Sequence, residues 1–585
     1  MRLAPVLTAA VFVLFAACSS PPPPKPGSET EIDPITNPPT NNNPVVEPPA
    51  VDPKEQRLTD LDDSQTLAAP ATAGRAMMRA EESYGFAPAP CCYNDPFPQD
   101  RENYAHLDDN PIHRAAEQPV STFSIDVDTA SYANVRRFLK QGRLPPQDAV
   151  RVEELINYFD YAYAPPRQTA TPFAVSTEMA PTPWNPKTHL LRIGIQGWKP
   201  QTRNLPPSNL VFLVDVSGSM AEPNKLPLVR SSLKLLTRHL RKDDRISLVT
   251  YAGSTEVVLE PTPGDERAKI EQAIDRLGAG GSTAGAAGIT LAYQQAEKAF
   301  MKNGNNRVLL ATDGDFNVGI VDFEQLKDLA EEKRKSGIAL TTLGFGTGNY
   351  NDQLMEQLAD AGNGNYGYID SLMEGQKLLV DQREATLFTI ARDVKIQVEF
   401  NPVVVAEYRL VGYENRMLKR EDFNNDKIDA GEIGAGHTVT ALYEVALTGS
   451  GGERVEPLRY SKEKPAGQSG DEIAFLRLRY KNPDEGMDAA SKLIEEPIRR
   501  RDIQTDIAGT SASFRLAASV AAFGQLLKGG NYTAGYGFDE AVQLARGARG
   551  DDRFGYVGEY VQLVQLAGSL STKAQTTQPT PTAME

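Results

Sequence analysis

The chain has 585 residues, enough for about three domains of ordinary size, and its formal net charge is −16. Binding to a phosphate backbone requires a basic surface, so this charge disfavours nucleic acid as a partner. With only three cysteines, Cys18, Cys91 and Cys92, the chain has neither a disulfide framework nor a CxxC metal pattern. The adjacent pair Cys91 and Cys92 leaves two alternatives open, a bridge to another chain and two free or modified thiols.

Residues 1–18 have the pattern of a signal peptide. Arg2 supplies a positive charge, and the apolar stretch from Leu3 to Ala17 is too short to span a bilayer. Small residues precede Cys18, and polar, Pro-rich sequence follows it. This pattern resembles the lipobox of bacterial lipoproteins and implies that Cys18 is the acylated first residue of the mature chain. In that family an Asp after the cysteine favours retention in the inner membrane, so Ser19 favours the outer membrane. We expect a lipid-anchored protein of the cell envelope, with its domains in the periplasm or at the cell surface.

Residues 19–118 predict a disordered, Pro-rich tether, because such a composition cannot bury a core. Residues 119–205 predict an N-terminal α+β segment. Its first part, "STFSIDVDTASYANVRRFL", has the pattern of a short strand and a helix, and "RVEELINYFDY" has that of a second helix. Two strand-like runs follow around Phe173–Met179 and Leu190–Gln196.

Residues 206–388 alternate between strand and helix patterns. Four short apolar runs are typical of strands buried on both faces: Leu210–Val214, Ile246–Val249, Val308–Leu310 and Ile338–Leu343. Between them, apolar residues recur at intervals of three and four. This alternation predicts an α/β domain with a doubly wound, mostly parallel sheet and helices on both faces.

The period of the pattern changes to two after about Ile390. Residues 389–482 predict a β-rich domain, residues 483–570 a helical C-terminal region, and residues 571–585 a disordered tail. The strands of 170–197 are too few to bury a core alone. We therefore expect them to pair with strands of 389–482, so that the α/β domain is an insertion in one β-rich domain.

Polar side chains gather where the strands of the α/β domain end. Asp215-Val-Ser217-Gly-Ser219 follows the first strand, and Thr312-Asp313-Gly314 follows a later one. A glycine-rich loop that contains Thr283 lies between them. In an open α/β sheet, ligands bind outside the carboxyl ends of the strands. Two carboxylates and three hydroxyls are hard oxygen donors, which select Mg, Ca or Mn over Zn.

These motifs, in this order and spacing, resemble the von Willebrand factor type A (VWA) domain over about residues 209–387. The resemblance implies a metal-ion-dependent adhesion site that grips a carboxylate of a protein partner through Mg (or Mn or Ca). Ser217 and Ser219 would bind the ion directly, Thr283 directly or through water, and Asp215 and Asp313 mainly through water. The flanking sequences resemble a group of bacterial envelope lipoproteins built around this domain.

Several rival interpretations have weaker support. A structural lipoprotein that does not use the metal is one alternative, and a metal-dependent hydrolase is another. We expect no enzymatic activity, because Ser217 stands where an aspartate-nucleophile phosphatase carries its acid, and none of the five histidines forms an HExxH motif. Asp422-x-Asn424-x-Asp426 resembles the start of a calcium loop, but it lacks the glycine at the sixth place, so an acidic surface turn is favoured.

Overall fold

The computed structural model describes residues 102–577 except 126–127, 168–170, 200–204, 282–284, 315–322, 349, 427, 429, 459–469, 484 and 486–488. The predictions for Cys18, Cys91, Cys92 and Thr283 therefore fall outside the described residues. The described residues all lie in one compact unit.

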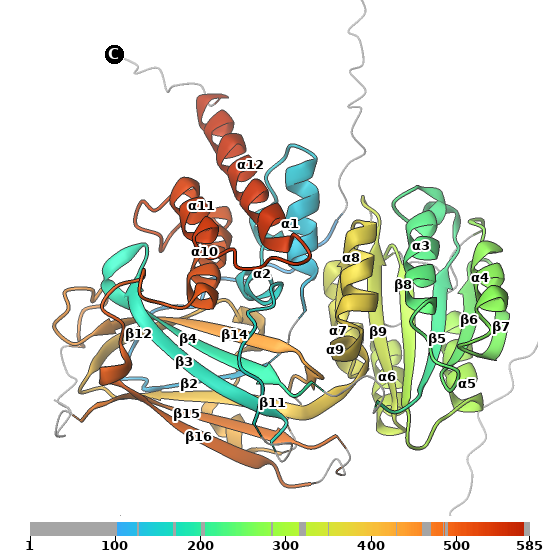
Figure 1. The fold of residues 1–585 in the computed structure, drawn as a ribbon, viewed down its shortest axis with the longest axis horizontal. Coiled ribbons are helices and arrows are strands. Elements are labelled where there is room, and N and C mark those ends of the chain that lie inside the picture. Colours follow the sequence, from blue (N-terminus) through green and yellow to red (C-terminus); the bar gives the residue numbers. More distant parts are fainter. Residues whose placement is uncertain are drawn as a thin grey trace, which may run out of the picture. The chain divides into compact units, whose positions relative to one another are not determined.

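The α/β domain contains a six-stranded sheet of order β10-β9-β8-β5-β6-β7, in which only β7 is antiparallel to its neighbour (Figure 1). Its strands are β5 (Ser208–Asp215), β6 (Arg245–Tyr251), β7 (Thr255–Pro263), β8 (Asn305–Thr312), β9 (Ile338–Phe345) and β10 (Tyr366–Ile369). All eight residues of β5 are buried, as expected for a strand covered on both faces. The predicted doubly wound, mostly parallel sheet is confirmed.

Helices cover both faces of this sheet. One core contains Leu210, Phe212 and Val214 with side chains of α3 (Leu226–Thr237) and α4 (Arg267–Asp275). The opposite core contains Val211 and Leu213 with side chains of α5 (Gly285–Lys298), α6 (Phe323–Lys335) and α7 (Asp352–Ala361). The alternation of side chains along a strand divides β5 between the two cores. Two short helices, α8 (Leu372–Gln376) and α9 (Arg383–Leu387), end the domain.

Two further sheets face each other and share one core. One has the order β1-β12-β14-β4-β3, formed by β1 (His113–Arg114), β12 (Val405–Val411), β14 (Thr438–Leu447), β4 (Asn185–Gly197) and β3 (Phe173–Thr182). The other has the order β13-β11-β15-β16, and β2 also pairs with β11. Its strands are β2 (Val120–Ser124), β11 (Thr389–Phe400), β13 (Ile433–Gly434), β15 (Glu472–Lys481) and β16 (Lys492–Arg499).

Strands on the two sides of the α/β domain are hydrogen-bonded to each other. β4 pairs with β14 from His189 opposite Val445 to Gln196 opposite Thr438, and β2 pairs with β11. The chain therefore leaves this pair of sheets after β4, forms the α/β domain and returns at β11.

The C-terminal helices α10 (Ala512–Leu527), α11 (Phe538–Arg546) and α12 (Tyr556–Thr577) lie over the sheet that holds β3, β4 and β14 (Figure 1). They share a core with α1 (Ala130–Lys140) and α2 (Val152–Asn157). At the start of α10, Ser511 accepts a hydrogen bond from the Phe514 N–H at 3.1 Å, an N-cap that fixes where the helix begins. None of the described helices is both long enough and apolar enough to cross a bilayer.

A buried arginine joins three parts of the chain. Arg136 on α1 is 1 % exposed. Its guanidinium lies 2.7 Å from the Glu374 carboxylate on α8 and 3.2 Å from the Glu559 carboxylate on α12, and it also pairs with Asp370. It donates to the Tyr158 hydroxyl at 2.9 Å. The α/β domain, the N-terminal segment and the C-terminal helices thus share one buried ionic cluster.

The structure corrects three predicted boundaries. Order begins by residue 102 inside the expected tether, because polar contacts rather than an apolar pattern hold this segment, such as the 2.7 Å ion pair of Glu102 with Arg137. The expected helical region of 483–570 contains strand β16, an edge strand whose partly exposed residues and Pro497 hide its alternation. Helix α12 continues through 571–577, which we expected to be disordered.

Candidate metal site

Asp215 is the last residue of β5 and is fully buried. Its Oδ1 accepts a hydrogen bond from the Ser217 N–H at 2.9 Å. Its Oδ2 accepts from the hydroxyls of Tyr251 at 3.2 Å and Thr312 at 3.0 Å. Donors from the carboxyl ends of β5, β6 and β8 therefore hold both carboxylate oxygens in place.

The two serines lie in the turn that follows Asp215. Their Oγ atoms are 3.0 Å apart. Ser217 is 2 % exposed, whereas Ser219 is exposed, so the pair extends from the interior to the surface. The two hydroxyls are close enough to bind one ion together.

Backbone hydrogen bonds tie this turn to the glycine-rich loop. The Gly218 N–H donates to the Gly281 carbonyl at 3.0 Å, and the Gly280 N–H donates to the Val216 carbonyl at 2.7 Å. The chain thus reaches Gly281, two residues before Thr283, in direct contact with the turn that carries the serines.

Asp313 directly follows β8 and is fully buried. Its Oδ2 lies 2.9 Å from the Nζ of Lys225, whose side chain is 5 % exposed. Gly314 has φ +86°, and a Cβ there would lie 2.8 Å from the backbone N of Asn351. Only glycine tolerates both conditions, which explains the glycine of the Thr-Asp-Gly motif.

The electrostatics of the site favour a cation. Burial raises the pKa of Asp215, and the charge of Asp313 adds to this, while hydrogen bonds from Ser217 and Thr312 oppose it. Two buried carboxylates and two hydroxyls on one edge form a donor set of hard oxygens, which fits Mg, Mn or Ca. Among the described residues no group of three His, Cys, Asp or Glu side chains could hold a metal, so a metal here needs the serines.

The structure adds residues to the predicted set. It brings Asp215, Ser217, Ser219 and Asp313 to one edge of the sheet and adds Tyr251 and Lys225. Tyr251 ends β6, so its place at the carboxyl end of a buried strand could have identified it. No signal in the sequence singles out Lys225, the residue before α3.

The suspected calcium loop is held by a lysine. Residues Arg420–Asn424 form a short 3-10 helix. The Lys395 Nζ donates to the carbonyls of Asp422 at 3.2 Å and Asn425 at 2.6 Å. A lysine ammonium therefore ties the backbone of this turn to β11, which supports the acidic surface turn.

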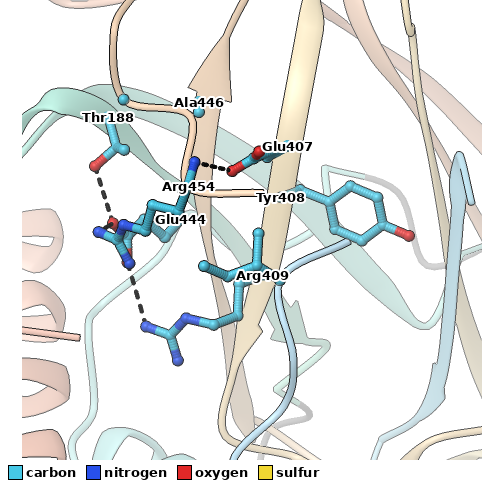
Figure 2. A pocket seen from close by; sticks show the side chains of 9 residues that line it. Thr188, Glu407, Tyr408, Arg409, Glu444, Ala446 and Arg454 are labelled. Carbon is cyan, nitrogen blue, oxygen red and sulfur yellow. Dashed lines mark hydrogen bonds and ion pairs between the residues drawn. The ribbon is translucent and has the colours of Figure 1, made fainter. Parts of the chain in front are cut away.

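A polar pocket on the β12–β14 sheet is structural (Figure 2). The Glu444 carboxylate pairs with Arg409 at 3.2 Å and Arg454 at 2.6 Å and accepts from the Thr188 hydroxyl at 3.0 Å. The pocket has a volume of only about 10 Å³, room for about one water molecule. Its charged side chains pair with one another, so the pocket has no room for a ligand larger than water.

The parallel sheet with helices on both faces, and the loops at its carboxyl edge, define a protein with a VWA domain. The family model of the von Willebrand factor type A domain matches residues 209–382, a model described as von Willebrand factor matches 98–192, and the model of the C-terminal part of uncharacterized protein YfbK matches 385–570. Proteins with this domain are generally binding or scaffold proteins, and the domain commonly binds Mg or Mn at an adhesion site.

The chain is 47 % identical over 480 residues to the uncharacterized protein YfbK of Escherichia coli (strain K12), which covers 81 % of this chain and 82 % of that relative. The chain belongs to the YfbK family. It is also 26 % identical over 264 residues to inter-alpha-trypsin inhibitor heavy chain H3 of Pongo abelii, covering 42 % of this chain and 30 % of that protein. A solved von Willebrand factor type A protein from Catenulispora acidiphila is 16 % identical, with a TM-score of 0.37 over 67 % of this chain and 90 % of that one.

Proposed function

We propose that this protein is a metal-dependent adhesion or scaffolding lipoprotein of the cell envelope. Its VWA domain would grip an acidic group of a protein partner through an ion held by Asp215, Ser217, Ser219, Thr283 and Asp313. The observation that carries the proposal is the convergence of two buried carboxylates and two serine hydroxyls at one edge of the sheet, where Ser219 is exposed.

The hydrogen bonds within the site divide the roles. Both oxygens of Asp215 already accept protein donors, which suits a carboxylate that acts through water. The hydroxyls of Ser217 and Ser219 are then the direct ligands. Mg usually retains waters and is bound by few carboxylates, so the ion would keep an open position for a carboxylate of the partner.

The envelope location is part of the same proposal and is supported by the sequence around Cys18. Acylation at Cys18 would anchor the chain, preferably in the outer membrane, and the Pro-rich segment would hold the VWA domain away from the lipid. No catalytic role is proposed, because both carboxylates among the described residues of the site already accept hydrogen bonds from protein donors.

One observation favours a second candidate, a structural protein that does not use the metal. The Nζ of Lys225 lies 2.9 Å from the Oδ2 of Asp313 and offsets that buried charge. In that case the loops would be held together without a divalent ion, and removing the metal donors would leave partner binding intact.

A crosslinked pull-down from intact envelopes separates the two candidates. Wild type and Ser219→Ala are compared with and without Mg. Because Ser219 is exposed, we expect this change to preserve the fold. Adhesion predicts partners that appear only in the wild type with Mg. Asp275→Asn, an exposed carboxylate paired with Lys234, is the control and should behave as wild type. The same partners in all samples would exclude the metal grip.

A further inference from the structure

A second cavity lies at the opposite edge of the VWA sheet, where the α/β domain joins the β-rich domain. It has a volume of about 510 Å³, within the range of small-molecule sites. Leu205 and Pro206, which lead into the domain, line it together with Leu387 and Phe388, which lead out. Arg307, near the start of β8, also lines it.

Arg307 is a buried cation that forms no ion pair with a carboxylate among the described residues. It is 2 % exposed, and its Nη1 donates to the Thr341 hydroxyl at 2.7 Å. Its Nε meets no hydrogen-bond acceptor in the described part of the chain. Burial lowers the pKa of Arg307 to about 10, opposed only by the charge of Glu432. An arginine carries five N–H donors, and Arg307 both donates to Thr341 and lines the cavity.

Positive side chains outnumber negative ones along the cavity. Arg334 and Arg392 line it as well. The described lining residues therefore include three guanidinium groups and one acid, Glu432. Glu432 in turn accepts hydrogen bonds from the Asn363 amide at 2.6 Å and the Thr389 hydroxyl at 3.3 Å. A buried cation such as Arg307 is costly unless an anion pairs with it. The cavity therefore favours an anionic ligand.

The remaining wall is apolar and suits the body of an organic molecule. Trp198 is 36 % exposed, and Leu205, Phe388 and Ile390 lie beside it on the same cavity. The planar guanidinium fork fits a carboxylate through two parallel hydrogen bonds. We propose that this cavity binds a small organic acid, with its carboxylate on Arg307 and its apolar body against Trp198 and Phe388. This ligand would touch both connections of the α/β domain, and its binding does not depend on the metal site.

Calorimetry on the full-length protein in detergent tests the proposal with a matched pair of probes, 1-naphthoate and the neutral 1-naphthamide. The acid should bind with one-to-one stoichiometry and at least about tenfold more tightly than the amide. It should also quench the fluorescence of Trp198, whereas the other tryptophan, Trp184, is 4 % exposed and reports little. Arg307→Met should abolish the preference for the acid.

Two further variants serve as controls. Arg553→Met alters a different cavity, of about 540 Å³, and should leave naphthoate binding unchanged. If Arg307→Met does not fold, as judged by circular dichroism, Arg307→Lys keeps the charge without the fork and should weaken naphthoate binding about tenfold. Equal affinity for acid and amide, an acid preference that survives in Arg307→Met, an unchanged naphthoate affinity in Arg307→Lys, or no binding up to about 10 mM would overturn the proposal.

Discussion

The Nζ of Lys225 lies 2.9 Å from the Oδ2 of Asp313, and both side chains are buried. Gly346 makes this contact possible, because its φ is +81° and a Cβ there would lie 2.4 Å from the Lys225 Cε. The lysine side chain thus packs against the backbone of Gly346, where no side chain blocks its path to the Asp313 carboxylate. A positive charge that belongs to the protein therefore lies beside one of the two carboxylates proposed to hold a divalent ion.

Replacing Lys225 should make the protein more dependent on the metal. In Lys225→Met the carboxylate of Asp313 loses its counter-charge, so the metal-free melting temperature should fall. The affinity for Mg should rise about tenfold, because a like charge close to the ion is removed. Calorimetry and melting curves with and without Mg measure both effects. The control Lys234→Met removes a surface ion pair with Asp275 and should change neither the melting temperature nor the affinity for Mg. An unchanged affinity for Mg in Lys225→Met would show that Lys225 does not oppose binding of the ion.

Gly346→Ala should lower the free energy of unfolding by about 1–3 kcal/mol, because the new methyl group combines a strained backbone with a clash against Lys225. Gly348→Ala is the matched control. Its φ is +95°, but nothing lies within 4 Å of its Cβ position, so only the backbone cost of about 1–2 kcal/mol applies. Urea unfolding measures the free energy of unfolding of both variants. An equal decrease in the two would show that the Lys225 side chain moves aside without a measurable loss of stability.

Arg136→Met should destabilise the protein by about 3–5 kcal/mol, because it leaves the buried carboxylates of Glu374 and Asp370 without their cation. Arg230→Met removes an exposed pair with Asp275 and should cost no more than about 1 kcal/mol. Urea or thermal unfolding separates the two variants. Similar stabilities would mean that the cluster does not join the three parts of the chain.

Acidification should destabilise the protein through His437, which is half-buried. Burial lowers the pKa of His437 to about 4, and the charge of Lys377 adds to the effect. Below the ordinary value of about 6.5, the unfolded chain binds a proton that the folded chain does not bind. The stability from this residue is therefore complete above about pH 6.5 and falls as the pH falls towards about 4. Between pH 7 and 5 the melting temperature of wild type should drop more than that of His437→Gln, and parallel curves would contradict the lowered pKa of His437.

The sequence predicted the elements whose residues follow one clear period. All eight positions of β5 are buried, so the apolar run Leu210–Val214 was enough to place the strand and hence Asp215 at its end. The pairing of β4 with β14 followed from the need of two short strand runs for a partner. In contrast, the exposed and partly buried positions of β16 follow no regular alternation, so the sequence does not show a strand there.

The candidate site was predictable only where a residue belongs to a local motif. Asp215, Ser217 and Ser219 lie within five residues of one another, so their proximity follows from the chain itself. Lys225 reaches Asp313 only because two loops far apart in sequence meet over Gly346. The role of Arg307 could not be predicted either. Its burial depends on the segments that lead into and out of the α/β domain, and the pattern of one strand does not show where those segments lie.

The entry and exit of the α/β domain both lie at one end of its sheet, around Leu205 and Leu387, while Asp215 and Asp313 lie at the other end. A pull on a partner held at Asp215 would therefore run along the length of β5 towards the rest of the molecule. β5 is hydrogen-bonded to β6 on one side and β8 on the other. Such a load shears both ladders at once, and their hydrogen bonds resist it together instead of opening one by one.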